Sequence, residues 1–209
     1  MKHIKGRKIK VVTLCLLTLC MLSALTACTA ARPETDASGQ SWDKNWIMIG
    51  TKTGLEGIPE GYKQLDNSDA LAVKGVYYQS FSKGEKSEVT DEDGEELIVY
   101  PGLIYILTQE CDTNEEAEAA IKEWAGKAEA QYTSIRGEFS SGDLKCHTIS
   151  YTLDKGKGYY VRGRSAFGTC GSVAMCCEMQ ATKDGPSEEE LVETMDKVLA
   201  DFHFAGDKE

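Results

Sequence analysis

Four sulfur-containing side chains lie close together in the last third of the chain. They are Met175, Cys176, Cys177 and Met179. Thioethers and thiolates are soft ligands that suit Cu(I), so one hypothesis is a soft-metal or thiol-redox site. In a β-strand, however, Met175, Cys177 and Met179 would share one face, and Cys176 would point to the other face with Ala174. Methionine and cysteine also pack well in apolar cores, so the pattern favours a core strand, and we assign no metal and no cofactor.

A serine and two histidines are the other candidates for catalytic chemistry. Ser165 lies in the segment 163–168, whose glycines miss the spacing of a nucleophile elbow by one residue. After residue 27 the histidines are His147 and His203, far apart in the sequence. A deep cleft that held His147 beside Ser165 would indicate a cell-envelope hydrolase, which stays an alternative. The sequence itself gives no catalytic constellation, and we predict a protein that is not an enzyme.

The acidic segment around Asp93 and Gly94 suggests cation binding at first sight. A calcium-binding loop needs an acidic residue at its first position and a glutamate at its twelfth. If Asp93 and Gly94 filled the fifth and sixth positions, the first would be Val89 and the twelfth Tyr100. The pattern therefore fails at both ends, and the segment is interpreted as a solvated hairpin turn.

The N-terminus has the pattern of an export signal. Five basic residues and no acidic residue occur among the first ten, and the segment 11–25 is uncharged and mostly apolar. This apolar run is shorter than the roughly 20 residues of a membrane-spanning helix. It ends in Leu25-Thr26-Ala27-Cys28. These residues resemble the lipobox of bacterial lipoproteins, in which the peptide is cut before a cysteine that carries diacylglycerol.

The lipobox resemblance implies that residues 1–27 form a signal peptide, cut between Ala27 and Cys28. Cys28 would be lipidated, and two acyl chains anchor a protein stably to a bilayer. The protein would then lie on the outer face of the cell membrane of a bacterium. Its partners would be the lipid bilayer and an unknown protein or small molecule.

The charge of the chain limits the possible partners. Residues 1–27 contain five of the 23 basic residues and none of the 34 acidic ones, which leaves a formal net charge of −16 from residue 28 onward. Nucleic-acid binding needs a basic surface, so we exclude nucleic acid as a partner. Residues 28–45 are small and polar and are expected to form a flexible tether. Residues 46–205 are long enough for a single domain with its own core.

Five cysteines remain after Cys28, and their number is odd. They are Cys111, Cys146, Cys170, Cys176 and Cys177. With turns centred near residues 155 and 170, Cys146 would pair with about residue 165, and that residue with about residue 174. Cys146 would then lie two strands from Cys176, roughly 9–10 Å away, beyond the reach of a disulfide. We therefore expect reduced, buried or half-buried thiols, with Cys170 in a tight turn.

Periodicity and turn signals predict the order of the elements. We expect strands over residues 46–49, 70–82 and 97–108, a helix after Thr113, strands over 144–153, 158–167 and 172–183, and a helix after Ser187. Proline cannot donate in a central ladder, so Pro101 should interrupt the third strand. Thr113 and Ser187 each have a glutamate three residues later, as in a capping box. The second helix should bury a stripe formed by Leu191, Met195, Val198, Leu199 and Phe202.

This order indicates an α+β fold with a largely antiparallel sheet of about six strands flanked by helices. The IPEGY turn at residues 58–62, the meander with Tyr159-Tyr160 and the acidic start of the last helix resemble the PsbP/Mog1-like family. The resemblance covers about residues 45–205 and implies an α-β-α sandwich with a noncatalytic binding or assembly role. The family has no shared catalytic set, so the resemblance assigns no ligand-binding residue.

Overall fold

The computed structural model describes residues 45–66, 73, 75–90, 96–131, 134–141, 144–152 and 159–204. The expected signal peptide, Cys28 and Asp93-Gly94 lie outside these residues. The elements, in chain order, are β1 (Ile47–Met48), β2 (Thr53–Leu55), β3 (Lys63–Gln64), β4 (Val76–Lys83), β5 (Ser87–Thr90), β6 (Glu96–Val99), β7 (Gly102–Glu110), α1 (Asn114–Gln131), β8 (Ser134–Ser141), β9 (Leu144–Thr152), β10 (Tyr160–Cys170), β11 (Val173–Thr182), α2 (Glu188–Ala200) and β12 (Phe202–Phe204).

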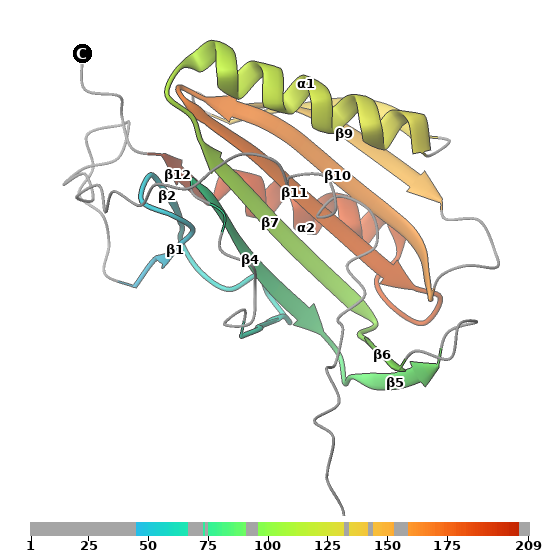
Figure 1. Ribbon diagram of the computed structural model, residues 1–209. Coiled ribbons are helices and arrows are strands. Elements are labelled where there is room, and N and C mark those ends of the chain that lie inside the picture. Colours follow the sequence, from blue (N-terminus) through green and yellow to red (C-terminus); the bar gives the residue numbers. More distant parts are fainter. Residues whose placement is uncertain are drawn as a thin grey trace, which may run out of the picture.

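A seven-stranded antiparallel sheet forms the centre of the fold, in the order β3-β4-β7-β11-β10-β9-β8. The prediction of an α+β fold with a largely antiparallel sheet is confirmed. Pro101 separates β6 from β7, as expected, and β6 pairs with β5 in a separate two-stranded sheet. Figure 1 shows this small hairpin at one end of the central sheet.

The central sheet differs from the expected one in three strands. The strand expected over residues 46–49 corresponds to β1, which lies in a separate small sheet, whereas the sequence pattern does not predict β8 and the short β3. β8 contains Gly137, a residue type that is unfavourable inside strands and weakens the strand signal of this segment. In the structure Gly137 pairs with Thr148, and a Cβ at this glycine would lie 2.8 Å from the Thr148 hydroxyl oxygen. The glycine therefore permits a close approach between two strands and does not end one.

The two faces of the sheet are buried under different helices. The odd-numbered residues of β11, from Val173 to Ala181, belong to a core cluster that includes the buried stripe of α2. The neighbouring Ala174 and Cys176 belong to a second cluster with α1, whose apolar stripe is Ala117, Ala120, Ile121, Trp124, Ala125 and Ala128. Figure 1 shows α1 and α2 on opposite sides of the sheet. We call these sides the α1 face and the α2 face.

Both helices begin at caps that the sequence predicts. At α2 the Ser187 side chain accepts from the Glu190 N–H, and the Glu190 side chain accepts from the Ser187 N–H, a complete capping box. At α1 Thr113 Oγ1 accepts from the Glu116 N–H at 3.2 Å, but the Glu116 carboxylate accepts from the Asp112 N–H at 3.1 Å. In the capping box of α1, the backbone N–H that donates to Glu116 is therefore that of Asp112, one residue before Thr113.

The prediction that Phe202 belongs to the last helical stripe is wrong. α2 ends at Ala200, and Phe202 lies in β12, where it pairs with Leu55 of β2. β12 completes a three-stranded sheet in the order β1-β2-β12, and Leu55 and Phe202 are part of the core cluster on the α2 face. Phe202 is buried in either case, but by strand pairing and not by continuation of the helix.

One carboxylate attaches this small sheet to the central one. Glu110, the last residue of β7, accepts hydrogen bonds from the N–H of Thr51 at 2.6 Å and of Lys52 at 2.9 Å, and from Thr51 Oγ1 at 2.8 Å. The turn also needs Gly50, which has φ +83° and whose Cβ would lie 2.5 Å from the Tyr77 ring.

The register of the β9-β10-β11 meander differs from the expected one. Cys146 pairs with Gly168, and Gly168 pairs with Met175, so the prediction that placed Cys146 opposite residue 165 is wrong. The reason is that β10 continues to Cys170, and the turn consists of Gly171, with φ +54°, and Ser172. Cys170 is therefore a strand residue and not a turn residue.

Candidate functional site

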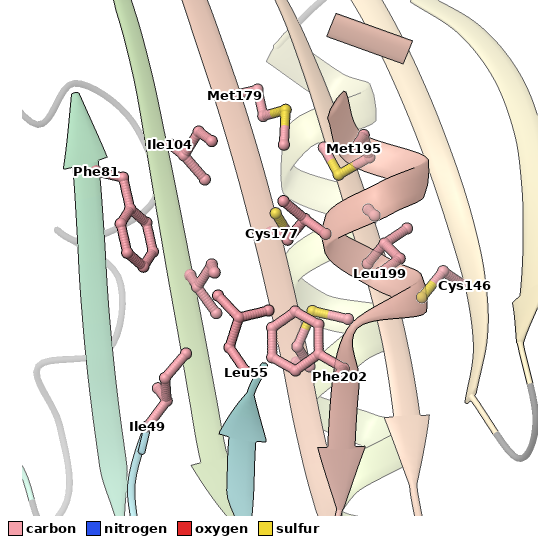
Figure 2. Close-up of a cluster of buried hydrophobic side chains, with 14 of the residues drawn as sticks. Ile49, Leu55, Phe81, Ile104, Cys146, Cys177, Met179, Met195, Leu199 and Phe202 are labelled. Atoms are coloured by element: carbon pink, nitrogen blue, oxygen red, sulfur yellow. The ribbon is translucent and has the colours of Figure 1, made fainter. Parts of the chain in front are cut away.

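The Met175–Met179 segment forms part of the core. Met175, Cys177 and Met179 are each 0% exposed and lie on the α2 face, while Cys176 lies in the α1-face cluster. Figure 2 shows Cys177 and Met179 among the apolar side chains of the α2-face core, together with Met195 and Leu199. The strand thus separates Cys176 from the other three sulfur atoms. In the described part of the chain, no group of three or more His, Cys, Asp or Glu side chains could hold a metal ion.

The five cysteines of the described residues are thiols, and three of them lie in surroundings that raise their pKa. Burial raises the pKa of Cys146 to about 12 and also raises the pKa of Cys177, where the nearby Cys146 adds to the effect. The pKa of the half-buried Cys111 is raised by burial and by the carboxylates of Glu116 and Asp112. Since the thiolate is the reactive form, these three thiols are poor nucleophiles near neutral pH. Cys146 and Cys176 also lie on opposite faces of the sheet, in agreement with the expected absence of a bridge between them.

A buried carboxyl group lies on the α1 face. Glu178 is 5% exposed, and its Oε1 accepts hydrogen bonds from the Tyr151 hydroxyl at 2.5 Å and from Gln180 Nε2 at 3.0 Å. Burial raises the pKa of Glu178, while the two hydrogen bonds act in the opposite direction. Tyr151 can span β10 because Gly163 lies beneath its ring, where a Cβ would come within 2.4 Å of Tyr151 Cζ. The group can hold a proton, but the pockets described below are not lined by Glu178.

The two residues of the hydrolase alternative lie on neighbouring strands but are not paired. Ser165 is 1% exposed and pairs with Ile149, whereas His147 pairs with Phe167. His147 Nε2 lies 3.0 Å from Glu129 Oε1 of α1, so the imidazole is oriented toward the helix. A nucleophile and its base need direct hydrogen-bond contact, and these positions do not place Ser165 against His147.

Two arginines line a small pocket on the α2 face, which we call the arginine pocket. It has a volume of about 200 Å³ and lies between the ends of β9 and β10 and the first turn of α2. Arg162 and Arg164 contribute the positive charge, Ser150 a hydroxyl group, and Glu188 a carboxylate; Leu191 of α2 also lines the pocket. Arg162 Nη1 donates to the carbonyl oxygens of Pro186 at 2.6 Å and Thr182 at 3.3 Å, which fixes this side chain against the segment that leads into α2.

A larger groove of about 660 Å³ runs between the 58–61 turn and α2. Ile58, which is 49% exposed, lies on its rim. Lys83 and Glu190 approach to 3.6 Å across the groove, and Asp201 lies at the end of α2. The pKa of Asp201 is raised by burial and by the Glu56 carboxylate, although His203 opposes this. The groove carries charges of both signs, and its acidic groups outnumber its basic ones.

Comparison with known proteins identifies no family for this chain. No protein-family model matches the sequence, and no curated protein matches it. Among solved structures, a protein from Bacteroides thetaiotaomicron VPI-5482, with a crystal structure at 1.50 Å, is similar over 78% of this chain, with 14% identity and a TM-score of 0.48. The aligned part covers 48% of that protein, so this chain spans about half its length. The similarity is too low to carry an argument about function.

The sequence interpretation did not single out the arginine pocket or Glu178, although both leave a signal. Arg162 and Arg164 lie on the same side of β10 as the buried Ala166, while Gly163 between them lies on the other side. Glu178 stands between Cys177 and Met179 in a run where every neighbour is buried. A charged residue at a position where the strand pattern demands an apolar one is the signal that could have found them.

Proposed function

We propose that the protein is a lipid-anchored extracytoplasmic protein whose folded part acts as a noncatalytic binding or assembly module. The observation that carries the proposal is the Leu25-Thr26-Ala27-Cys28 sequence at the end of a basic-then-apolar N-terminal segment. A thiol at this position is the expected acceptor for diacylglycerol, and the anchor would hold the protein on the outer face of the bacterial cell membrane. Within the described ranges, no helix combines the length and the apolar character required to cross a bilayer.

We further propose that the fold is an α-β-α sandwich of the PsbP/Mog1-like type. The support is the placement of α1 and α2 against opposite faces of the central antiparallel sheet. A fold of this kind hosts many functions, so the binding role depends on the sites and not on the architecture. The arginine pocket and the α2 groove are the concave surfaces that a small molecule or another protein would use.

The two alternative functions have less support. A soft-metal or thiol-redox role would need Met175, Cys176, Cys177 and Met179 to converge, but Cys176 faces α1 and the other three face α2. A hydrolase would need an activated nucleophile, but Ser165 is buried opposite Ile149 and His147 contacts Glu129. The low reactivity of the buried thiols and the pairing of His147 favour a binding role.

The anchor is tested by changing Cys28. The full-length protein and its Cys28→Ala variant are expressed in a bacterium that is fed an alkyne-labelled fatty acid. We expect the wild-type chain to be labelled, shortened and found with the membrane, and the variant to be unlabelled and uncut or released. Cys20→Ala, which removes a cysteine of the apolar run but leaves the lipobox intact, is the matched control and should behave as wild type. Labelling and membrane retention of Cys28→Ala would disprove the lipid anchor.

A further inference from the structure

Arg164 carries a positive charge that no acidic partner neutralises in the described part of the chain. Its Nη1 donates to Ser150 Oγ at 2.7 Å, and its Nη2 approaches Thr148 Oγ1 at 3.4 Å. Both partners are neutral hydroxyl groups. The Nε–H group is buried and has no hydrogen-bond partner. A guanidinium has five N–H donors, so most of the donor capacity of Arg164 is unused.

This arrangement is unusual in a chain that contains 34 acidic residues and 23 basic ones. Removing a charged group from water is unfavourable unless an opposite charge and hydrogen bonds compensate for the lost hydration. The exposed arginine of β8, Arg136, does have such a partner, since its Nη2 lies 2.7 Å from Glu129 Oε2. Arg164 is half-buried and lacks one, although carboxylates are abundant in the chain. An anion supplied from solution would fill this role.

The arginine pocket has the size and the charge for such an anion. Its volume of about 200 Å³ is below the roughly 300–1,000 Å³ of sites for drug-sized ligands, which suits a small group. Arg162 and Arg164 supply two positive charges and Glu188 one negative charge, so a net charge of one faces the pocket. Ser150 adds a hydroxyl group that hydrogen-bonds Arg164 and can also reach an oxygen atom.

We propose that the arginine pocket binds a small oxyanion, a carboxylate or phosphate group, with the Arg164 guanidinium as its principal donor. A planar guanidinium matches two oxygen atoms of either group in a forked hydrogen-bond geometry. Arg162, whose Nη1 is held by the carbonyl oxygens of Pro186 and Thr182, adds a second positive charge to the pocket. Glu188 lies at the same pocket and opposes the anion, so it limits binding to groups of low charge. This inference names a ligand class for the proposed binding module and rests on that proposal only for its biological role.

The experiment uses isothermal titration calorimetry with the full-length protein in neutral detergent, at constant low ionic strength. The probes are inorganic phosphate and acetate, with chloride as the control anion. We expect saturable binding of phosphate or acetate, weakened by added sodium chloride because salt screens the attraction. A response to phosphate alone would identify a phosphate group as the ligand chemistry, and a response to acetate would identify a carboxylate.

Three variants locate the site. Arg164→Gln should weaken binding by about ten- to a hundredfold, the effect expected for one charge-assisted interaction. Arg136→Gln, which removes an arginine that is paired with Glu129, is the matched control and should leave binding unchanged. Glu188→Gln should strengthen binding by about two- to fivefold, because it removes the opposing charge at an exposed position.

Two outcomes would overturn the proposal. The first is that phosphate and acetate give no more heat than chloride with the wild-type protein. The second is that Arg164→Gln binds as tightly as wild type. If Arg164→Gln does not fold, the sign of the Glu188→Gln effect decides, since unchanged or weaker binding in that variant would place the anion elsewhere. Neither result alters the lipid-labelling test of Cys28, so the two proposals fail independently.

Discussion

A substitution at Met179 tests, through the free energy of unfolding, whether the sulfur-containing side chains of β11 serve as core packing. The side chain is 0% exposed and belongs to the same core cluster as Ile104, Leu191 and Met195. Met179→Ala removes Cγ, Sδ and Cε, and the lost burial alone corresponds to about 2 kcal/mol at about 0.8 kcal/mol per methylene-sized group. The cavity that remains adds to this, so the free energy of unfolding should fall by about 2–5 kcal/mol, with about 3 kcal/mol as the central expectation.

Urea unfolding, followed by tryptophan fluorescence, measures this loss of stability for Met179. Ile58→Ala is the control, because Ile58 is 49% exposed and its truncation should change stability by less than about 1 kcal/mol. The same samples are melted under reducing conditions with and without Cu(I), which should not raise the melting temperature if the strand is only core. A loss below about 1 kcal/mol in Met179→Ala would refute the packing argument. A copper-dependent rise that disappears in Cys177→Ser would support the soft-metal alternative.

Three further substitutions test the polar and backbone features of the fold. The pKa of Glu178 is raised in the folded state, so the folded protein holds a proton that the unfolded chain has lost, and the free energy of unfolding falls as pH rises from about 4.5 through the raised pKa. Glu178→Gln should remove that fall. Parallel pH profiles of urea unfolding in the two proteins would contradict this. Ser187→Ala removes the helix cap and should lower the free energy of unfolding by about 1 kcal/mol, whereas an unchanged urea midpoint would show that the cap contributes nothing. Gly163→Ala places a Cβ within 2.4 Å of the Tyr151 ring and should lower the melting temperature and alter the near-ultraviolet tyrosine signal. Gly126→Ala, at a glycine with open space around it, is the control and should not lower stability. Equal melting temperatures for the two variants would argue against the close contact.

Local signals were sufficient to predict the parts of the fold whose stability has local causes. The capping residue Ser187 and the stripe Leu191–Leu199 define α2, and both are confirmed. Strand alternation placed Cys177 and Cys176 on opposite faces, as the two core clusters show. In each case the hydrogen-bond and burial pattern is contained in one short segment.

The missed features depend on residues that are distant in the sequence. Gly137 has no strand signal of its own, because its role is to make room for the Thr148 hydroxyl on the neighbouring strand. The register of Cys146 depends on where β10 ends, which the Gly171–Ser172 turn decides. The arginine pocket is formed by two β-strands and a helix that begins 24 residues after Arg164, so the sequence showed the charges but not their convergence.

The pairing of β12 with β2 has a consequence for the order in which the chain can complete its fold. Phe202 and Leu55 are adjacent in the structure although almost the whole described chain separates them. During synthesis from the N-terminus, β2 emerges early and has no partner on that side until β12 follows. Such non-local pairing slows folding and leaves a strand edge and the Leu55 side chain accessible in the meantime. The three-stranded sheet therefore cannot be completed until β12, the last strand of the described residues, has been synthesised.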